Sequence, residues 1–346
     1  MAYSSIAKPG DYFNTVLYSG NGSTNAITGV GFQPDWLWVK CRSNGNGHQL
    51  FDVLRTTYSI STNVNDAQAN RASDGFTSLD SDGFTMNGSG SGGNTNVSGR
   101  TYVGWNWRAG GSGSSNSNGS VTSTVSANTT AGFSVCKFTY PSSGNFTFGH
   151  GLGVAPKMFI LKGLGTANWQ VYHEVLGNTK NIQLNYATTA NSAANWWGST
   201  SPTSTVCTVG ADLIESGQDA IAYCFAEKRG YSKFGKYTGN GNADGPFVYT
   251  GFKPAWMMFK PDASADWTMV DAKRNTFNPV ADKTLNANLD SVEHDGSADL
   301  DFYSNGFKIK NANTDTNNSG TIIYWAFAEN PFVGNDSGTA VPVTAR

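Results

Sequence analysis

The stretch that decides the fold is GFQPDWLWVK at residues 31–40, and the chain repeats it twice. The other copies are GVAPKMFILK at residues 153–162 and GFKPAWMMFK at residues 251–260, aligned without a gap. Successive side chains of a strand point to opposite faces, so Trp36, Trp38 and Lys40 share one face while Leu37 and Val39 share the other. Both faces are mainly apolar, which predicts a central strand buried on both sides.

The segments around each copy repeat in the same order. An aromatic-rich segment precedes each one: FNTVLYSGNG (13–22), FSVCKF (133–138) and FGKYTGNG (234–241). A short apolar run follows: HQLFD (48–52), WQVYH (169–173) and WTMVD (267–271). Each copy closes on an aromatic strand: VGWNW (103–107), IAYCF (221–225) and IYWAF (323–327). Four landmarks recurring in order, about 100–120 residues apart, indicate three copies of one structural unit.

Each copy is predicted to be β-structure. Its apolar runs are short, rich in aromatic and β-branched residues, and bounded by Gly, Asn, Pro and Ser clusters, and no ten-residue stretch has helical periodicity. We therefore expect an all-β fold of three tandem β-sandwich domains, jelly-roll or lectin-like, each with about seven to ten strands. The expected boundaries are 1–108, a Gly/Ser/Asn-rich linker at 109–130, then 131–228 and 229–346.

Composition removes several classes of function. Charged residues are 14% of the chain and the formal net charge is −2, so the electrostatics that drive nucleic-acid binding are missing. No apolar run approaches the roughly 20 residues that span a bilayer, and the N-terminus lacks a secretory pattern, so no membrane insertion is expected. The cysteines lie far apart without a CxxC pair, which favours reduced, buried thiols.

Catalytic patterns are weak. Asp52 and Arg55, like Asp271 and Arg274, stand three residues apart at equivalent places in two copies. A carboxylate beside an arginine is compatible with acid–base chemistry, but a salt bridge that ties a strand end to its loop explains its duplication better. Nucleophile-elbow, P-loop and zinc-protease motifs are missing, so we expect a protein that is not an enzyme.

An acidic run at residues 290–301 is the weak metal candidate. Its oxygen-rich side chains include Asp290, Asp295 and Asp299, a composition that calcium accepts, although the spacing is not that of an EF-hand. A hydrated acidic loop is the favoured interpretation, and no cofactor is expected.

Aromatic residues carry the remaining functional signal. Trp196 and Trp197 follow Asn195 in a polar loop, and an exposed ring beside amide groups suits the apolar face and hydroxyls of a sugar. The alternative, which we favour, is a loop folded over the end of the sandwich with its rings inserted. The strand tryptophans are expected in the core: Trp36, Trp38, Trp105, Trp107, Trp256 and Trp325.

At the repeated segments the sequence resembles a family of β-rich structural proteins of tailed phages, especially those that infect marine bacteria. The resemblance rests on DYFNTVLYSGNG, GVGFQPDWLWVK, HGLGVAPKMFILK, YTGNGNADGPFVYTGFKPAW and YWAFAENPF, and it covers nearly the whole chain. It implies a virion component made in the host cytoplasm and located on the outer surface of the tail or capsid, tail-fibre-like in character. It also implies other virion proteins as partners, and we expect a homo-oligomer.

Two functions from different classes follow. The first is a receptor-binding or adhesive module that displays loops to host surface glycans, for which repeated weak sites give avidity. The second is a decoration or joint protein that binds other virion proteins through apolar patches. A polysaccharide depolymerase is a third, less favoured alternative.

Overall fold

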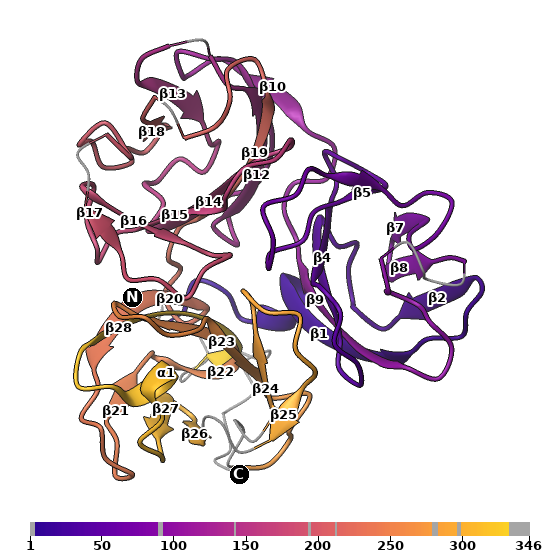
Figure 1. Ribbon diagram of the computed structural model, residues 1–346, viewed down its shortest axis with the longest axis vertical. Coiled ribbons are helices and arrows are strands. Elements are labelled where there is room, and N and C mark those ends of the chain that lie inside the picture. Colours follow the sequence, from indigo (N-terminus) through magenta and orange to yellow (C-terminus); the bar gives the residue numbers. More distant parts are fainter. Residues whose placement is uncertain are drawn as a thin grey trace.

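The computed structural model describes residues 4–88, 93–141, 143–192, 195–211, 213–278, 283–295 and 299–331. Apart from the 3-10 turn η1 (Pro9–Asp11) and the short helix α1 (Thr314–Asn317), the regular elements in these ranges are β-strands, which confirms the all-β class. No helix of the described ranges is long and apolar enough to cross a membrane. Figure 1 shows the strands gathered into three lobes around a common centre. We call these lobes the first (4–108), second (109–228) and third (229–331) units.

Each unit has a large inner sheet. In the first unit its strands, in spatial order, are β1 (Phe13–Ser19), β9 (Thr101–Trp107), β3 (Trp36–Cys41) and β4 (Gln49–Asp52). In the second they are β10 (Ser114–Asn116), β11 (Ser123–Asn128), β12 (Phe133–Thr139), β19 (Asp219–Phe225), β14 (Met158–Gly163), β15 (Gln170–His173), β16 (Lys180–Gln183) and β17 (Asn191–Ser192). In the third they are β20 (Ser232–Thr238), β28 (Thr321–Pro331), β22 (Phe252–Pro261), β23 (Thr268–Asp271), β24 (Lys283–Asn286) and β25 (His294–Asp295).

Smaller sheets cover the outside of each unit. They are β2 (Asn25–Thr28), β8 (Gly83–Met86) and β7 (Ser78–Asp80) in the first, β13 (Phe146–Gly149) and β18 (Val206–Val209) in the second, and β21 (Phe247–Tyr249), β27 (Gly306–Ile309) and β26 (Leu300–Tyr303) in the third. A short pair, β5 (Tyr58–Ser59) and β6 (Ala69–Asn70), completes the first unit. Each unit is thus a two-sheet sandwich, as the strand pattern predicted.

The repeated segment forms the same strand with the same register in all three units. Its first core residue pairs with the closing strand on one side and with the following short strand on the other: Trp36 with Trp107 and Asp52, Met158 with Phe225 and His173, and Trp256 with Phe327 and Asp271. β3 is buried along its whole length between β9 and β4, which confirms the predicted central strand.

The units meet on one shared hydrophobic core. The inward face of β3, with Trp36 and Trp38, belongs to a single buried cluster that contains residues of all three inner sheets. Trp36 stacks on Tyr223 of the second unit with ring centroids 4.6 Å apart. The other face of β3, with Leu37, packs toward the outer sheet in a cluster confined to the first unit. The three tandem sandwiches are therefore not independent, because their inner faces bury one another.

Residues 109–130 were expected to be a linker, and most of them are part of the second unit instead. β11 pairs with β12 over five residue pairs, and β10 pairs with β11, so this segment extends the second inner sheet. The Gly/Ser/Asn-rich composition reflects an edge of that sheet, where side chains such as Ser114 and Thr124 face solvent.

Hydrogen bonds close the three units into a ring. One aromatic side chain in each unit contacts a backbone carbonyl oxygen of the preceding unit through a ring nitrogen at 2.9 Å. The pairs are Trp169 Nε1 with Ser61 O, Trp267 Nε1 with Gln183 O, and His48 Nε2 with Asn286 O. The third pair joins the last unit to the first, so the repeat closes on itself.

Candidate functional site

The two Asp–Arg pairs lie buried in the seams between units. Asp52 accepts from Arg55 Nε at 2.7 Å and from the Tyr223 hydroxyl of the second unit at 2.8 Å. Asp271 accepts from Arg274 Nε at 2.6 Å, and Trp105 Nε1 of the first unit donates to it at 3.0 Å. These contacts confirm the interpretation of the pairs as salt bridges that tie a strand end to its loop.

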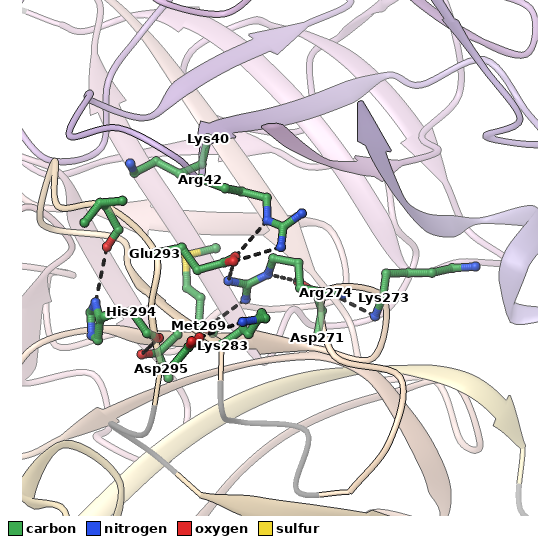
Figure 2. A network of polar contacts seen from close by, with 12 residues as sticks. Lys40, Arg42, Met269, Asp271, Lys273, Arg274, Lys283, Glu293, His294 and Asp295 are labelled. Carbon is green, nitrogen blue, oxygen red and sulfur yellow. Dashed lines mark hydrogen bonds and ion pairs between the residues drawn. The ribbon is translucent and has the colours of Figure 1, made fainter. Parts of the chain in front are cut away.

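The seam between the third and first units carries a further ion-pair network. Figure 2 shows Arg42 of the first unit and Arg274 of the third converging on Glu293, with nitrogen–oxygen distances of 2.8 and 3.1 Å. Asp271 lies on the other side of Arg274. Glu293 and Asp271 each have an arginine partner, so these ion pairs join the third unit to the first.

The third seam, between the second and third units, has a histidine where the other two seams have the carboxylate of an Asp–Arg pair. His173 occupies the position of Asp52 and Asp271, and burial lowers its pKa to about 4. Its Nδ1 accepts from the Val175 amide at 3.3 Å, while its Nε2 has no hydrogen-bond partner within the described part of the chain. Trp325, which corresponds to Trp105, lies with His173 around a space that is too small to hold a water molecule. Around His173 this seam is packed with apolar side chains, and elsewhere it is crossed by the Lys180–Asp262 ion pair at 3.1 Å and by the Trp267–Gln183 hydrogen bond.

The lysine that ends each repeated segment has a structural role. Lys40, Lys162 and Lys260 are fully buried, and each ammonium group donates to the carbonyl oxygen of the next residue at 2.6–2.8 Å. Burial disfavours the charged form and lowers the pKa of each to about 8.

The acidic run does not gather into a cluster. Asp290 and Asp295 are exposed, and Asp295 forms an ion pair with Lys283 at 2.7 Å. Asp299 is half-buried and directly precedes β26. In the ranges that the structure covers, no three His, Cys, Asp or Glu side chains stand close enough to hold a metal ion. The four cysteines are free and buried, as predicted.

The tryptophan loop buries one of its two rings completely, as the favoured interpretation of this loop describes. Trp197 is fully buried, its Nε1 donates to Lys180 O at 2.8 Å, and its ring packs edge-on against Phe159. Trp196 is half-buried against the same cluster, and only Asn195 is exposed. The expectation that Trp197 presents a ring to a ligand is therefore wrong, and the favoured alternative, rings inserted into the end of the sandwich, describes it. The strand tryptophans are buried as predicted.

An exposed aromatic surface lies on the outer sheet of the third unit. Phe247, Tyr249 and Tyr303 are 48, 53 and 40% exposed, and we call them the aromatic platform. Tyr249 and Tyr303 both pair with Gly306, and Phe247 stands two residues from Tyr249 on the same strand, so all three rings share one sheet face. The Phe247 and Tyr303 centroids are 5.8 Å apart. A side chain at Gly306 would enter this face.

Polar groups flank the platform on the next register row. Phe247 pairs with Lys308, which in turn pairs with Asp301. The Lys308 ammonium binds Asp244 at 2.7 Å and Gly245 O at 2.6 Å. Asp301 lies 3.6 Å from Lys310. The face combines exposed rings with carboxylates and an ammonium group, and its charges are already paired.

The fold does not require the platform. In the first unit the same register positions hold Thr28, Gly83 and Asp80, with Ala26 in place of Phe247. There the Asp80 carboxylate accepts from Ser78 and Thr85 at 2.6 Å, so the face is covered by short polar side chains. The same scaffold therefore forms with and without the rings.

Sequence reasoning missed the platform because it examined tryptophans rather than the outer strands. The signal was present as FVY at residues 247–249, where two aromatic residues flank an inward-facing valine. Aligning the third copy with the first at this point would have found it.

The comparisons with known proteins give the family without a function. No curated protein and no solved structure matches the chain. One family, described as Domain of unknown function (DUF7483), matches residues 8–331, a span that includes all three units. The chain belongs to this DUF7483 family.

Proposed function

We propose that the protein is a non-catalytic virion module that binds glycans of the host surface through the aromatic platform. The observation that carries this proposal is the set of three exposed rings in the third unit, at positions where the first unit has Ala26, Thr28 and Asp80. The sequence resemblance to tailed-phage structural proteins supports the virion location.

The chemistry of the platform suits a sugar. Aromatic faces stack on the apolar face of a pyranose, and side chains such as Asp301 and Lys308 can exchange their contacts for sugar hydroxyls. The sheet backbone holds the rings in place, so little side-chain entropy is lost on binding. Exposing a phenylalanine and two tyrosines costs free energy on a soluble surface, which a binding role explains.

A variant in which the three platform residues are replaced by their counterparts from the first unit tests this function. Phe247→Ala, Tyr249→Thr and Tyr303→Asp together place the residues of the first unit at the three ring positions. Glycan-array and host-cell binding are measured for this variant and for Tyr186→Ala, which removes an aromatic ring 42% exposed in the second unit. Each platform ring is expected to contribute about 5–30-fold in affinity, so the triple variant loses binding while the control retains it.

A decoration or joint protein is the second candidate, because exposed aromatic rings also form protein interfaces. It predicts that the triple variant fails to assemble into virions while the unmodified protein binds no glycan. Blank glycan and cell-binding assays with the unmodified protein would refute the adhesive function, and unchanged binding of the triple variant would refute the platform as its site. Released oligosaccharide on incubation with host polysaccharide would indicate the depolymerase instead.

A further inference from the structure

A polar groove lies between the first and second units, far along the sequence from the platform. Its volume is roughly 580 Å³, within the usual range for small-molecule sites. The first unit contributes Asp35, from the repeated segment, and Arg108, which follows β9. The second contributes the glycines after Arg108 and the turn between β11 and β12.

Asp35 is the group that makes this groove unusual. It is 2% exposed, and its Oδ2 accepts from the Gly111 amide at 3.2 Å. Its Oδ1 is buried and has no hydrogen-bond partner in the described ranges. Desolvation by burial raises the pKa of this carboxyl, against the opposing effects of the Gly111 and Ala109 amides and of Arg108. A buried acceptor without a donor is unfavourable unless a ligand supplies one.

The fold does not need Asp35 or Arg108. At the position of Asp35 the other two copies have Lys157 and Ala255, and both form the same strand. The residue corresponding to Arg108 is alanine in both other copies, directly after Phe225 and Phe327. A cavity of roughly 390 Å³ at the seam between the third and first units is lined by Ala255 and Ala328 instead.

The rest of the groove is suited to a hydroxyl-rich ligand. Arg108 is exposed and forms no salt bridge in the part of the chain that the structure describes, although its charge acts on Asp35. Thr129 and Thr130 are exposed, and the Tyr12 ring forms part of the wall. No second carboxylate lines the groove, which disfavours a metal ion as its occupant.

We propose that this groove is a second binding site, specific for a saccharide residue that bears a carboxylate. A sugar hydroxyl donates to the carboxylate of Asp35 at the wall of the groove, and the guanidinium of Arg108 binds the sugar carboxylate. A guanidinium matches a carboxylate with two parallel hydrogen bonds, which gives preference over a neutral sugar. The site does not involve the platform, so the two proposals stand or fall separately.

D-Glucuronate and D-glucose are the matched probes, with binding followed by NMR titration. The unmodified protein is expected to bind glucuronate about tenfold or more tightly than glucose. Arg108→Ala should lose this preference and keep weak glucose binding, whereas Asp35→Ala should lose both. Both substitutions introduce residues that the other copies contain, and tryptophan fluorescence verifies their folding. Lys236→Ala, which removes an exposed lysine of the third unit, is the charge control and should bind as the unmodified protein does.

Three results would overturn the proposal. They are no binding of glucuronate by the unmodified protein, equal affinity for the two sugars, and glucuronate binding that survives in Asp35→Ala. The platform triple variant separates this site from the proposed function, because it should bind glucuronate normally even after losing its glycan binding. Conversely, Asp35→Ala should retain the binding that the platform provides.

Discussion

Removing the charge of Asp52 or of Asp271 should destabilise the ring by clearly different amounts. Both carboxylates are completely buried and pair with a buried arginine, and Asn preserves their volume, so Asp52→Asn and Asp271→Asn remove charge without opening a cavity. Breaking one partner of a buried ion pair costs about 3–5 kcal/mol because the other charge stays buried. After the substitution, the Arg274 guanidinium still contacts the Glu293 carboxylate at 3.1 Å, whereas the partners left to Arg55 among the described residues are the Leu50 carbonyl oxygen and the Tyr223 hydroxyl.

We therefore expect Asp52→Asn to cost about 4–5 kcal/mol and Asp271→Asn about 2–3 kcal/mol. Urea unfolding at pH 7, followed by tryptophan fluorescence and far-UV circular dichroism, measures the free energy of unfolding of each variant. The two values can be compared if the m-value is unchanged. Glu174→Gln breaks the exposed pair with Lys157 and should change stability by less than about 1 kcal/mol. Equal costs for the two buried substitutions would refute the compensating role of Glu293. Separate transitions in the unmodified protein would refute a core shared by all units.

Three further outcomes follow from the packing. The pKa of His173 is lowered to about 4, below the 6.5 of an unfolded chain. The folded state is therefore favoured above pH 6.5, and the free energy of unfolding should fall by about 3 kcal/mol as the pH drops to 4. His173→Asn should remove that part of the pH dependence of urea unfolding. Trp197→Ala should cost about 3–5 kcal/mol by urea unfolding and Trp196→Ala clearly less, and equal losses would contradict the burial difference. A Cβ at Gly306 would lie 2.1 Å from Val248 O, so Gly306→Ala should lower the free energy of unfolding by about 1–3 kcal/mol. The same substitution should weaken glycan binding at the platform. An unchanged free energy of unfolding would show that β21 and β27 can move apart without cost.

Much of each unit could be predicted from local pattern. The alternation in residues 36–40 identified a strand buried on both faces, and β3 has Trp36 toward the shared core and Leu37 toward the outer sheet. The matching registers of β3, β14 and β22 follow from the same repeated segment. Such patterns are local because side chains alternate along any strand, whatever lies beyond it.

Site residues were harder to predict. Trp197 lies in a loop, where no periodicity indicates which side chains turn inward, and its burial depends on contact with Phe159 from another strand. The segment at 109–130 has the composition of a linker, yet it forms the last two strands of the second inner sheet, β10 and β11, because β12 offers backbone groups with which β11 can pair.

The sequence by itself determined the β-class, the threefold repeat and the apolar faces of the repeated strand, since these depend on residue type and spacing along the chain. Only the tertiary structure decided what each apolar face packs against. That choice closed the units into a ring, placed Asp35 and Arg108 beside a turn of the second unit, and made the rings of the platform 40–53% exposed. The physical reason is that burial specifies how much apolar surface must leave water but not which surface covers it, because the hydrophobic effect has no direction of its own.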